Sequence, residues 1–110
     1  MAEQAEALGW VDVPVPLPAS GRSVAFEVEG ARLVLCHADG GVYVIEDRCP
    51  HMRAPLAGGR LRGTLLECPL HGGRIDVRDG SAAGRPIRTS VVTFPVRRIG
   101  DRIEVALPKR

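Results

Sequence analysis

The sequence predicts an all-β fold, and three observations support this prediction. Nine prolines and thirteen glycines divide the 110 residues into short segments, which leaves little room for amphipathic helices. The segment RSVAFEV (22–28) alternates with period two and places Val24, Phe26 and Val28 on one face. Turn signals recur about every eight to twelve residues, a spacing typical of antiparallel sandwiches and barrels.

Short strands are predicted along the whole chain, each bounded by a turn or loop signal. In order they are GWVDVPV (9–15), RSVAFEV (22–28), RLVLCH (32–37), VYVIED (42–47), RIDV (74–77), VVTFPVRRI (91–99) and RIEVAL (102–107). Asp39-Gly40 is a hairpin signal, and a second hairpin is expected within GGRLRGTLLE (58–67). The segment RDGSAAGRP (78–86) is expected to be a loop, and the first ten residues leave room for a helical turn.

Length and composition fit one globular domain, predicted to span residues 1–110. The formal net charge of +2 is too small to indicate a nucleic-acid partner. The N-terminus has neither the basic nor the apolar region of a signal peptide, and no apolar run approaches the roughly 18 residues of a membrane span. We therefore expect a cytoplasmic monomer with no membrane partner.

Most of the chain's soft metal ligands lie in one stretch, CPHMRAPLAGGRLRGTLLECPLH (49–71). Cys49 and His51 open the stretch, and Cys68 and His71 close it. The chain has three cysteines, an odd number, and two of them have histidine neighbours, so a disulfide framework is not indicated. A metal site is therefore one candidate interpretation of the pattern.

The residues alone leave three interpretations of this pattern open. The four side chains could be unconnected, although prolines and glycines punctuate both pairs. They could form a Cys₂His₂ zinc site, although a single residue between Cys and His is tight for one tetrahedral ion. They could hold a two-iron, two-sulfide cluster with both cysteines on one iron and both histidines on the other, which suits the alternation of the ligands.

The stretch and its surroundings resemble the Rieske family, whose motif is C-x-H, about sixteen residues, then C-x-x-H. Accessory residues of the motif match at Pro50, Pro69, Gly72 and Gly73. The likeness covers about residues 8–107 and includes VYVIEDRCPH, ECPLHGGRIDVRDG and TFPVRRIGDRIEVAL.

This resemblance implies a Rieske-type antiparallel β-sandwich or barrel with a small cluster-binding subdomain, formed by two loops at about 47–80. It implies one Rieske-type [2Fe-2S] cluster per chain. Cys49 and Cys68 would ligate the inner iron, and His51 and His71 the outer iron at the surface.

High-potential members of the family carry a disulfide between the loops, and a serine and a tyrosine that donate to the cluster sulfurs. This chain has Pro55 or Leu56 and Leu70 at the disulfide positions, Gly73 at the serine position and Ile75 at the tyrosine position. The resemblance therefore implies a potential at the low end of the Rieske range.

The chain is expected to move electrons rather than to catalyse a reaction. Only His37 remains once His51 and His71 are used, so a mononuclear iron site is excluded, and no G-x-G-x-x-G is present. The leading hypothesis is a ferredoxin that carries single electrons from an NAD(P)H-dependent flavoprotein reductase to a terminal oxygenase of the aromatic-ring dioxygenase type. The alternatives are the small Rieske subunit of an assimilatory nitrite reductase and a zinc-stabilised interaction module.

Other candidate residues have simpler explanations. Cys36 lies in an apolar strand and is expected to be a small buried filler, and His37 an ordinary exposed imidazole. The segment 48–88 carries three acids and eight arginines, which form either a solvated surface or a docking patch, at positions 48, 53, 60, 62, 74, 78, 85 and 88.

Overall fold

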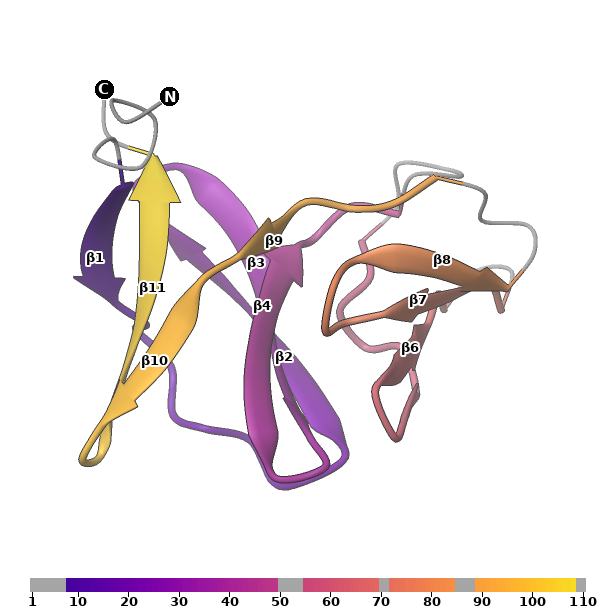
Figure 1. The fold of residues 1–110 in the computed structure, drawn as a ribbon, viewed down its shortest axis with the longest axis horizontal. Helices are drawn as coiled ribbons and strands as arrows, with labels where there is room; N and C mark the ends of the chain where they lie inside the picture. The colour runs from indigo at the N-terminus through magenta and orange to yellow at the C-terminus, as the bar shows by residue number, and fades with distance from the viewer. Residues whose placement is uncertain (1–7, 50–54, 70–71, 85–88, 109–110) are drawn as a thin grey trace.

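The structure, a computed structural model, describes residues 8–49, 55–69, 72–84 and 89–108. All regular secondary structure in these residues is β-strand, in three antiparallel sheets (Figure 1), so the predicted all-β fold is confirmed. None of the described residues forms a helix long and apolar enough to cross a membrane. The strands are β1 (Leu8–Asp12), β2 (Arg22–Val28), β3 (Ala31–Ala38), β4 (Gly41–Glu46), β5 (Leu61–Arg62), β6 (Leu65–Glu67), β7 (Arg74–Asp76), β8 (Ser81–Gly84), β9 (Thr93–Phe94), β10 (Val96–Ile99) and β11 (Arg102–Pro108).

Two sheets form the base of the molecule, which we define as β1–β4 and β9–β11. The outer sheet has the order β1-β11-β10, and the middle sheet has the order β2-β3-β4-β9. The predicted hairpin at Asp39-Gly40 joins β3 to β4, and both residues have the positive φ (51° and 78°) of a type I′ turn. Glu29 and Gly30 join β2 to β3 in the same way, with φ of 51° and 81°. These tight turns hold the three strands in continuous register.

Strand β3 is buried on both faces because it lies between two apolar cores. Leu33 and Leu35 belong to the base core, which includes side chains of β2, β4 and β11. Val34, Cys36 and Ala38 belong to the loop-side core, which includes side chains of β4 and of the third sheet. Successive side chains of a strand point to opposite faces, so the alternation assigns each residue of β3 to one core.

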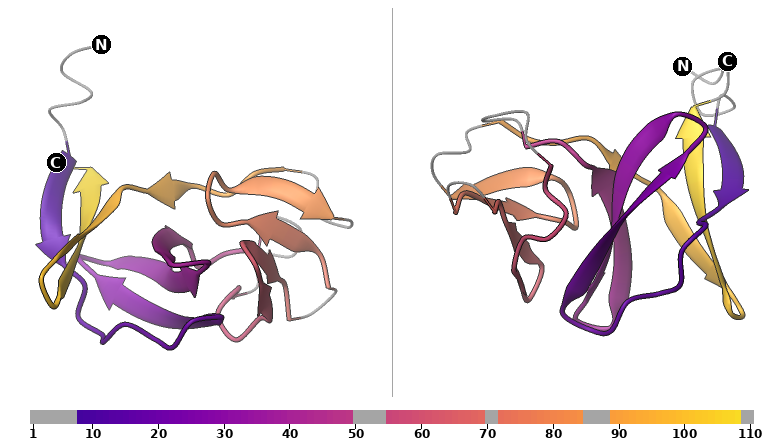
Figure 2. Two further views of the ribbon diagram at one scale, coloured as in Figure 1. Left: turned by 60° about the horizontal axis from the view of Figure 1, so that its bottom comes forward. Right: turned by 180° about the vertical axis from the view of Figure 1, so that it is seen from behind.

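The third sheet, with the order β5-β6-β7-β8, lies beside the base (Figures 1 and 2). Its first two strands confirm the hairpin predicted within 58–67. Leu61, Leu66 and Ile75 from this sheet are buried in the loop-side core, against β3 and β4. We call residues 47–92 the loop unit, because they form one insertion between β4 and β9 that carries both halves of the predicted motif.

The loop predicted at 78–86 is wrong over Ser81–Gly84, which forms β8 and pairs with β7. A tight turn causes the pairing, because Asp79 Oδ1 accepts a hydrogen bond from the amide of Ser81 at 2.9 Å and Gly80 has φ of 78°. Serine, alanine and glycine have little β propensity, so the sequence alone did not indicate a strand here.

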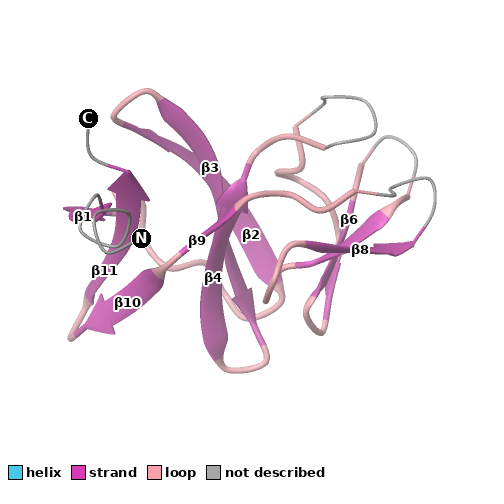
Figure 3. Ribbon diagram, turned by 45° about the horizontal axis from the view of Figure 1, so that its top comes forward, coloured by secondary structure: helices cyan, strands magenta, loops and turns pink. Residues whose placement is uncertain are grey.

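The single strand predicted at 91–99 is two strands in different sheets. Pro95 separates β9, which pairs with β4, from β10, which pairs with β11. Proline has no N–H and a fixed φ, so the ladder of β9 stops there. The carbonyl of Pro95 instead accepts a hydrogen bond from the amide of Ala106 at 2.9 Å. Figure 3 shows the chain crossing here from the middle sheet to the outer sheet.

Candidate metal centre

Both predicted cysteine ligands are buried where the loop unit meets the base. Cys49 lies shortly after β4, and Cys68 directly follows β6. The two residues are 0% and 2% exposed, and both belong to the loop-side core. A thiolate in an apolar core needs a compensating positive charge, which a metal ion supplies. The two cysteines therefore fit a metal centre, whereas His51 and His71 lie outside the described residues and their ligand role stays a prediction.

Loop one, residues 47–57, is closed by a carboxylate. Asp47 Oδ1 accepts hydrogen bonds from the amide of Leu56 at 2.7 Å and from the amide of Ala57 at 2.9 Å. The amide of Asp47 itself donates to the carbonyl of Arg32 in β3 at 2.9 Å. The start of loop one is thus fixed both to the base and to the end of the same loop.

Loop two, residues 68–73, is closed by its own backbone. The amide of Cys68 donates to the carbonyl of Gly73 at 2.7 Å, and the amide of Gly72 donates back to the carbonyl of Cys68 at 3.0 Å. Gly72 has φ of 74°, a conformation that other residues adopt only with strain. The reversal of the chain therefore explains the glycine at this motif position.

The hairpin of β5 and β6 connects the two loops along the chain. Residue 59, just before β5, passes so close to β6 that a side chain there would collide with the carbonyl oxygen of Glu67, so only Gly59 fits. The amide of Glu67 donates to the carbonyl of Arg60 at 2.8 Å. Glu67 is the residue immediately before Cys68, so these contacts fix the point where the hairpin leads into loop two.

The third cysteine lies in the same core but has the properties of a filler. Cys36 is fully buried in the described structure, and burial raises the pKa of its thiol to about 12. A thiol with this pKa stays protonated at neutral pH and binds metals poorly. The interpretation of Cys36 as an apolar packing residue agrees with these properties.

The expectation that His37 is an ordinary exposed imidazole is wrong. His37 is half-buried, and its Nδ1 lies 2.8 Å from the carbonyl oxygen of Pro18. The ring connects β3 to the segment before β2. No sequence pattern shows this contact, because the two residues are nineteen positions apart.

Positive charge gathers on the loop unit, and only part of it is neutralised locally. Arg78 pairs with Asp76, with Nη2 and Oδ2 2.7 Å apart, and hydrogen bonding from this guanidinium lowers the pKa of Asp76 to about 2. Four other arginines are exposed and form no ion pair among the described residues: Arg48, Arg60, Arg62 and Arg74. The remaining three, at positions 53, 85 and 88, lie outside the described residues.

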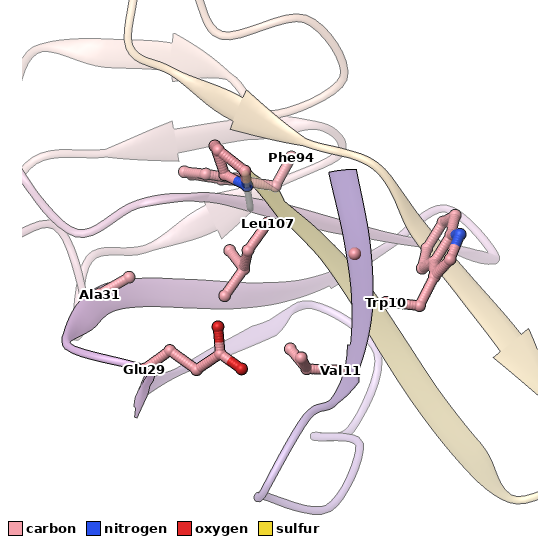
Figure 4. A pocket seen from close by; sticks show the side chains of 8 residues that line it. Trp10, Val11, Glu29, Ala31, Phe94 and Leu107 are labelled. Carbon is pink, nitrogen blue, oxygen red and sulfur yellow. The ribbon is translucent and has the colours of Figure 1, made fainter. Parts of the chain in front are cut away.

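The base has a cleft of about 770 Å³, lined by residues of β1, β3, β9 and β11 (Figure 4). It opens between β1 and the turn that joins β2 to β3. Its described lining includes no cysteine or histidine, and Glu29 supplies its one charged side chain. The cleft is therefore separate from the candidate metal centre.

The fold and the loops first define a class of protein: a small all-β domain in which two braced loops present buried cysteines to a metal centre. The family model described as "Rieske [2Fe-2S] domain" matches residues 10–95. The chain belongs to the Rieske family, and its cofactor is a [2Fe-2S] cluster. The interpretation as a zinc-stabilised module is therefore wrong.

Individual relatives agree in sequence and in structure. The chain is 35% identical to the ferredoxin component of a naphthalene 1,2-dioxygenase system from Pseudomonas aeruginosa, over 89% of this chain and 95% of the relative. The ferredoxin of carbazole 1,9a-dioxygenase from Nocardioides aromaticivorans IC177 is 33% identical with a TM-score of 0.82, over 91% and 98% of the two chains. A chain from a complex of reduced oxygenase and oxidized ferredoxin in carbazole 1,9a-dioxygenase is 30% identical with a TM-score of 0.81, over 92% and 95%. By these likenesses the chain is an electron-transfer component and not an enzyme.

Proposed function

We propose that this chain carries single electrons from an NAD(P)H-dependent flavoprotein reductase to a terminal oxygenase of the aromatic-ring dioxygenase type. The observation that carries the proposal is the match, over nearly the full length of both chains, to proteins named as ferredoxin components of dioxygenase systems. The identity of 33–35% to these ferredoxins, against 22% to a putative nitrite reductase small subunit, favours this carrier over the nitrite reductase alternative. We further propose that it acts as a cytoplasmic monomer of one domain, with the cluster bound within about 47–80.

In this proposal Cys49 and Cys68 ligate the inner iron, and His51 and His71 ligate the outer iron. The burial of both cysteines in the loop-side core supports their half of the assignment. The cluster, when bound, accepts and releases one electron at a time. The protein residues hold it, exclude water on the cysteine side and set its potential through their hydrogen bonds and charges.

The reduction potential is expected at the low end of the Rieske range, roughly −150 to −100 mV. Ile75, which has no donor group, fills the tyrosine position and is fully buried in the core that contains both cysteines. Gly73 at the serine position has no hydroxyl either. A redox titration followed by EPR spectroscopy measures this value, and a potential above zero would contradict the argument.

Docking is proposed to use the exposed arginines of the loop unit. Electron carriers bind their partners briefly, and opposite charges speed the encounter at low salt. The deciding experiment is stopped-flow reduction of the purified protein by a flavoprotein reductase, and its reoxidation by a ring-hydroxylating oxygenase, across a range of salt concentrations. We expect both rates to fall as salt rises.

Charge reversal tests which arginines take part. Arg60→Glu is expected to slow association while leaving the potential nearly unchanged. Arg98→Glu is the matched control, because Arg98 is also exposed but lies on β10 in the outer sheet of the base. If the rates do not change with salt and Arg60→Glu associates as fast as Arg98→Glu, the arginines have no role in docking and form only a solvated surface.

A further inference from the structure

The carboxylate of Asp47 makes hydrogen bonds to the far end of loop one, and the proposed function does not yet give Asp47 a role. Its Oδ1 accepts hydrogen bonds from two consecutive amides, those of Leu56 and Ala57, nine and ten residues further along the chain. A carboxylate that accepts backbone hydrogen bonds makes charge-assisted bonds, which are shorter and stronger than neutral ones. One half-buried side chain thus bridges the whole of loop one.

Both ends of loop one are also anchored by buried side chains. Cys49 lies near the start of the loop and Leu56 near its end, and both are 0% exposed in the loop-side core. The amide of Gly59 donates to the carbonyl of Leu56 at 3.1 Å, in the turn that leads into β5. Because Asp47 holds the amide of Leu56, it fixes the distance between the point where loop one leaves the core and the point where it returns.

The main chain of Asp47 also connects loop one to the base. Its amide donates to the carbonyl of Arg32 at 2.9 Å, so its main chain is part of the region where β3 and β4 pair. The neighbouring Glu46 makes a different contact: its Oε1 accepts from the amide of Val92 at 3.0 Å, outside loop one. Of these two adjacent acids, only Asp47 spans the loop.

We propose that Asp47 is a positioning residue for the cluster, whose carboxylate joins the two ends of loop one and so fixes the position of Cys49. This inference rests on the proposed ligand role of Cys49. Residues behind the ligands of a metal site change its metal affinity by about 10- to 100-fold when they are replaced. Asp47 acts by accepting two hydrogen bonds. A side chain with the same acceptor geometry is therefore expected to take over its role.

The test compares the holoprotein with Asp47→Ala, Asp47→Asn and the control Val105→Ala. Val105 is fully buried in the base core, so its truncation lowers global stability without touching loop one. The measurements are iron and sulfide per chain, the EPR spectrum of the reduced protein, and the rate at which a chelator bleaches the visible absorption. The melting temperature is recorded for each variant to separate loop effects from global destabilisation.

In Asp47→Ala we expect bleaching about tenfold faster than in the wild type and an altered EPR g-anisotropy. In Asp47→Asn, whose Oδ1 can accept both amides, both properties should return close to wild-type values. Val105→Ala should melt at a lower temperature but keep the wild-type spectrum and bleaching rate. If Asp47→Ala does not accumulate in folded form, Asp47→Ser, with a shorter acceptor, takes its place and should bleach faster than the wild type.

Three results would overturn the inference. They are wild-type bleaching and EPR spectra in Asp47→Ala or its serine substitute, bleaching in Asp47→Asn as fast as in Asp47→Ala, or the same acceleration in Val105→Ala. Failure of the proposed function is a separate outcome, because it would show as the absence of a Rieske spectrum in the wild-type protein.

Discussion

The base and the loop unit are both built from antiparallel strands, but different interactions hold them in shape. Strands β2, β3 and β11 of the base have seven or eight residues, and their hydrogen-bond ladders enclose a core of large apolar side chains. Strands β5–β8 of the loop unit have two to four residues. A few separate hydrogen bonds close its loops, such as those that the carboxylate of Asp47 accepts from two backbone amides.

This difference indicates where the cluster is needed for folding. A short-stranded unit has few buried contacts of its own, and segments of this kind open locally at low free-energy cost. Metal binding adds its free energy to the folded state of the segment that supplies the ligands. We therefore expect the base to keep its structure without the cluster and the loop unit to loosen.

The largest effect is expected from Cys68→Ser, which should abolish normal cluster assembly. Visible and EPR spectra would lose the Rieske signal, and amide hydrogen exchange would become fast in peptides covering 61–84 but stay slow in peptides covering 22–46. Cys36→Ser, prepared in parallel, controls for the loss of a buried sulfur and should keep the signal. A full native spectrum in Cys68→Ser would show that the ligand assignment is wrong.

Leu35→Ala should affect the opposite region. Leu35 is fully buried in the base core, and truncation of a buried leucine costs about 2–5 kcal/mol of unfolding free energy. Because its side chain points away from the loop-side core, the reduction potential and the EPR spectrum should remain unchanged. A large change in potential at wild-type stability would mean that the two cores are not independent. Denaturant unfolding and redox titration of the same samples decide this.

The next residue along β3 belongs to the other core and should have a smaller effect. Cys36→Ala removes one sulfur from the loop-side core, for which we expect a loss of about 1 kcal/mol in unfolding free energy. The potential and the electron-transfer rate should be nearly unchanged, because the pKa of about 12 keeps the thiol neutral. Loss of the cluster signal in this variant would show that Cys36 does more than pack.

The smallest effect is expected from Asp76→Asn on the surface of the loop unit. The folded pKa of Asp76, about 2, lies below its ordinary value of 3.8, so ionised Asp76 stabilises the fold above about pH 4 and this contribution is lost between about pH 4 and pH 2. The Arg78 side chain is 62% exposed, so solvent screens the ion pair and the variant should lose no more than about 1 kcal/mol at pH 7.

Melting temperatures of the wild type and Asp76→Asn, measured from pH 7 downward, provide the check. The gap between them should be constant from pH 7 to about pH 5 and narrow below about pH 4. A gap that widens in acid would contradict the sign of this argument.

The base was more predictable from sequence than the loop unit, for a physical reason. Period-two alternation and tight turns are local signals, and they located β2 at its observed bounds and the turn at Asp39-Gly40. The missed strand β8 has side chains too small to show alternation, and the strand predicted through Pro95 crosses between sheets.

In the loop unit, sequence located the two buried cysteines but not their support. Asp47 is one acid among thirteen acidic residues, and its partner amides lie nine and ten positions away. No periodicity or short motif encodes a contact of this kind. The structure was therefore needed to separate the ligands, which the spacing indicates, from the residues that brace them.

The way the loop unit joins the base bears on whether it could be transplanted. It leaves after β4 and returns before β9, and these strands are paired, with the amide of Glu46 donating to the carbonyl of Val92 at 3.0 Å. Its two ends are thus about 5 Å apart, one strand spacing, so any host with two neighbouring antiparallel strands could accept them. The host would also have to supply one wall of the core, as Val34, Cys36 and Ala38 do here. A graft that matched the chain ends but lacked that apolar wall would leave the cysteine side of the cluster open to water.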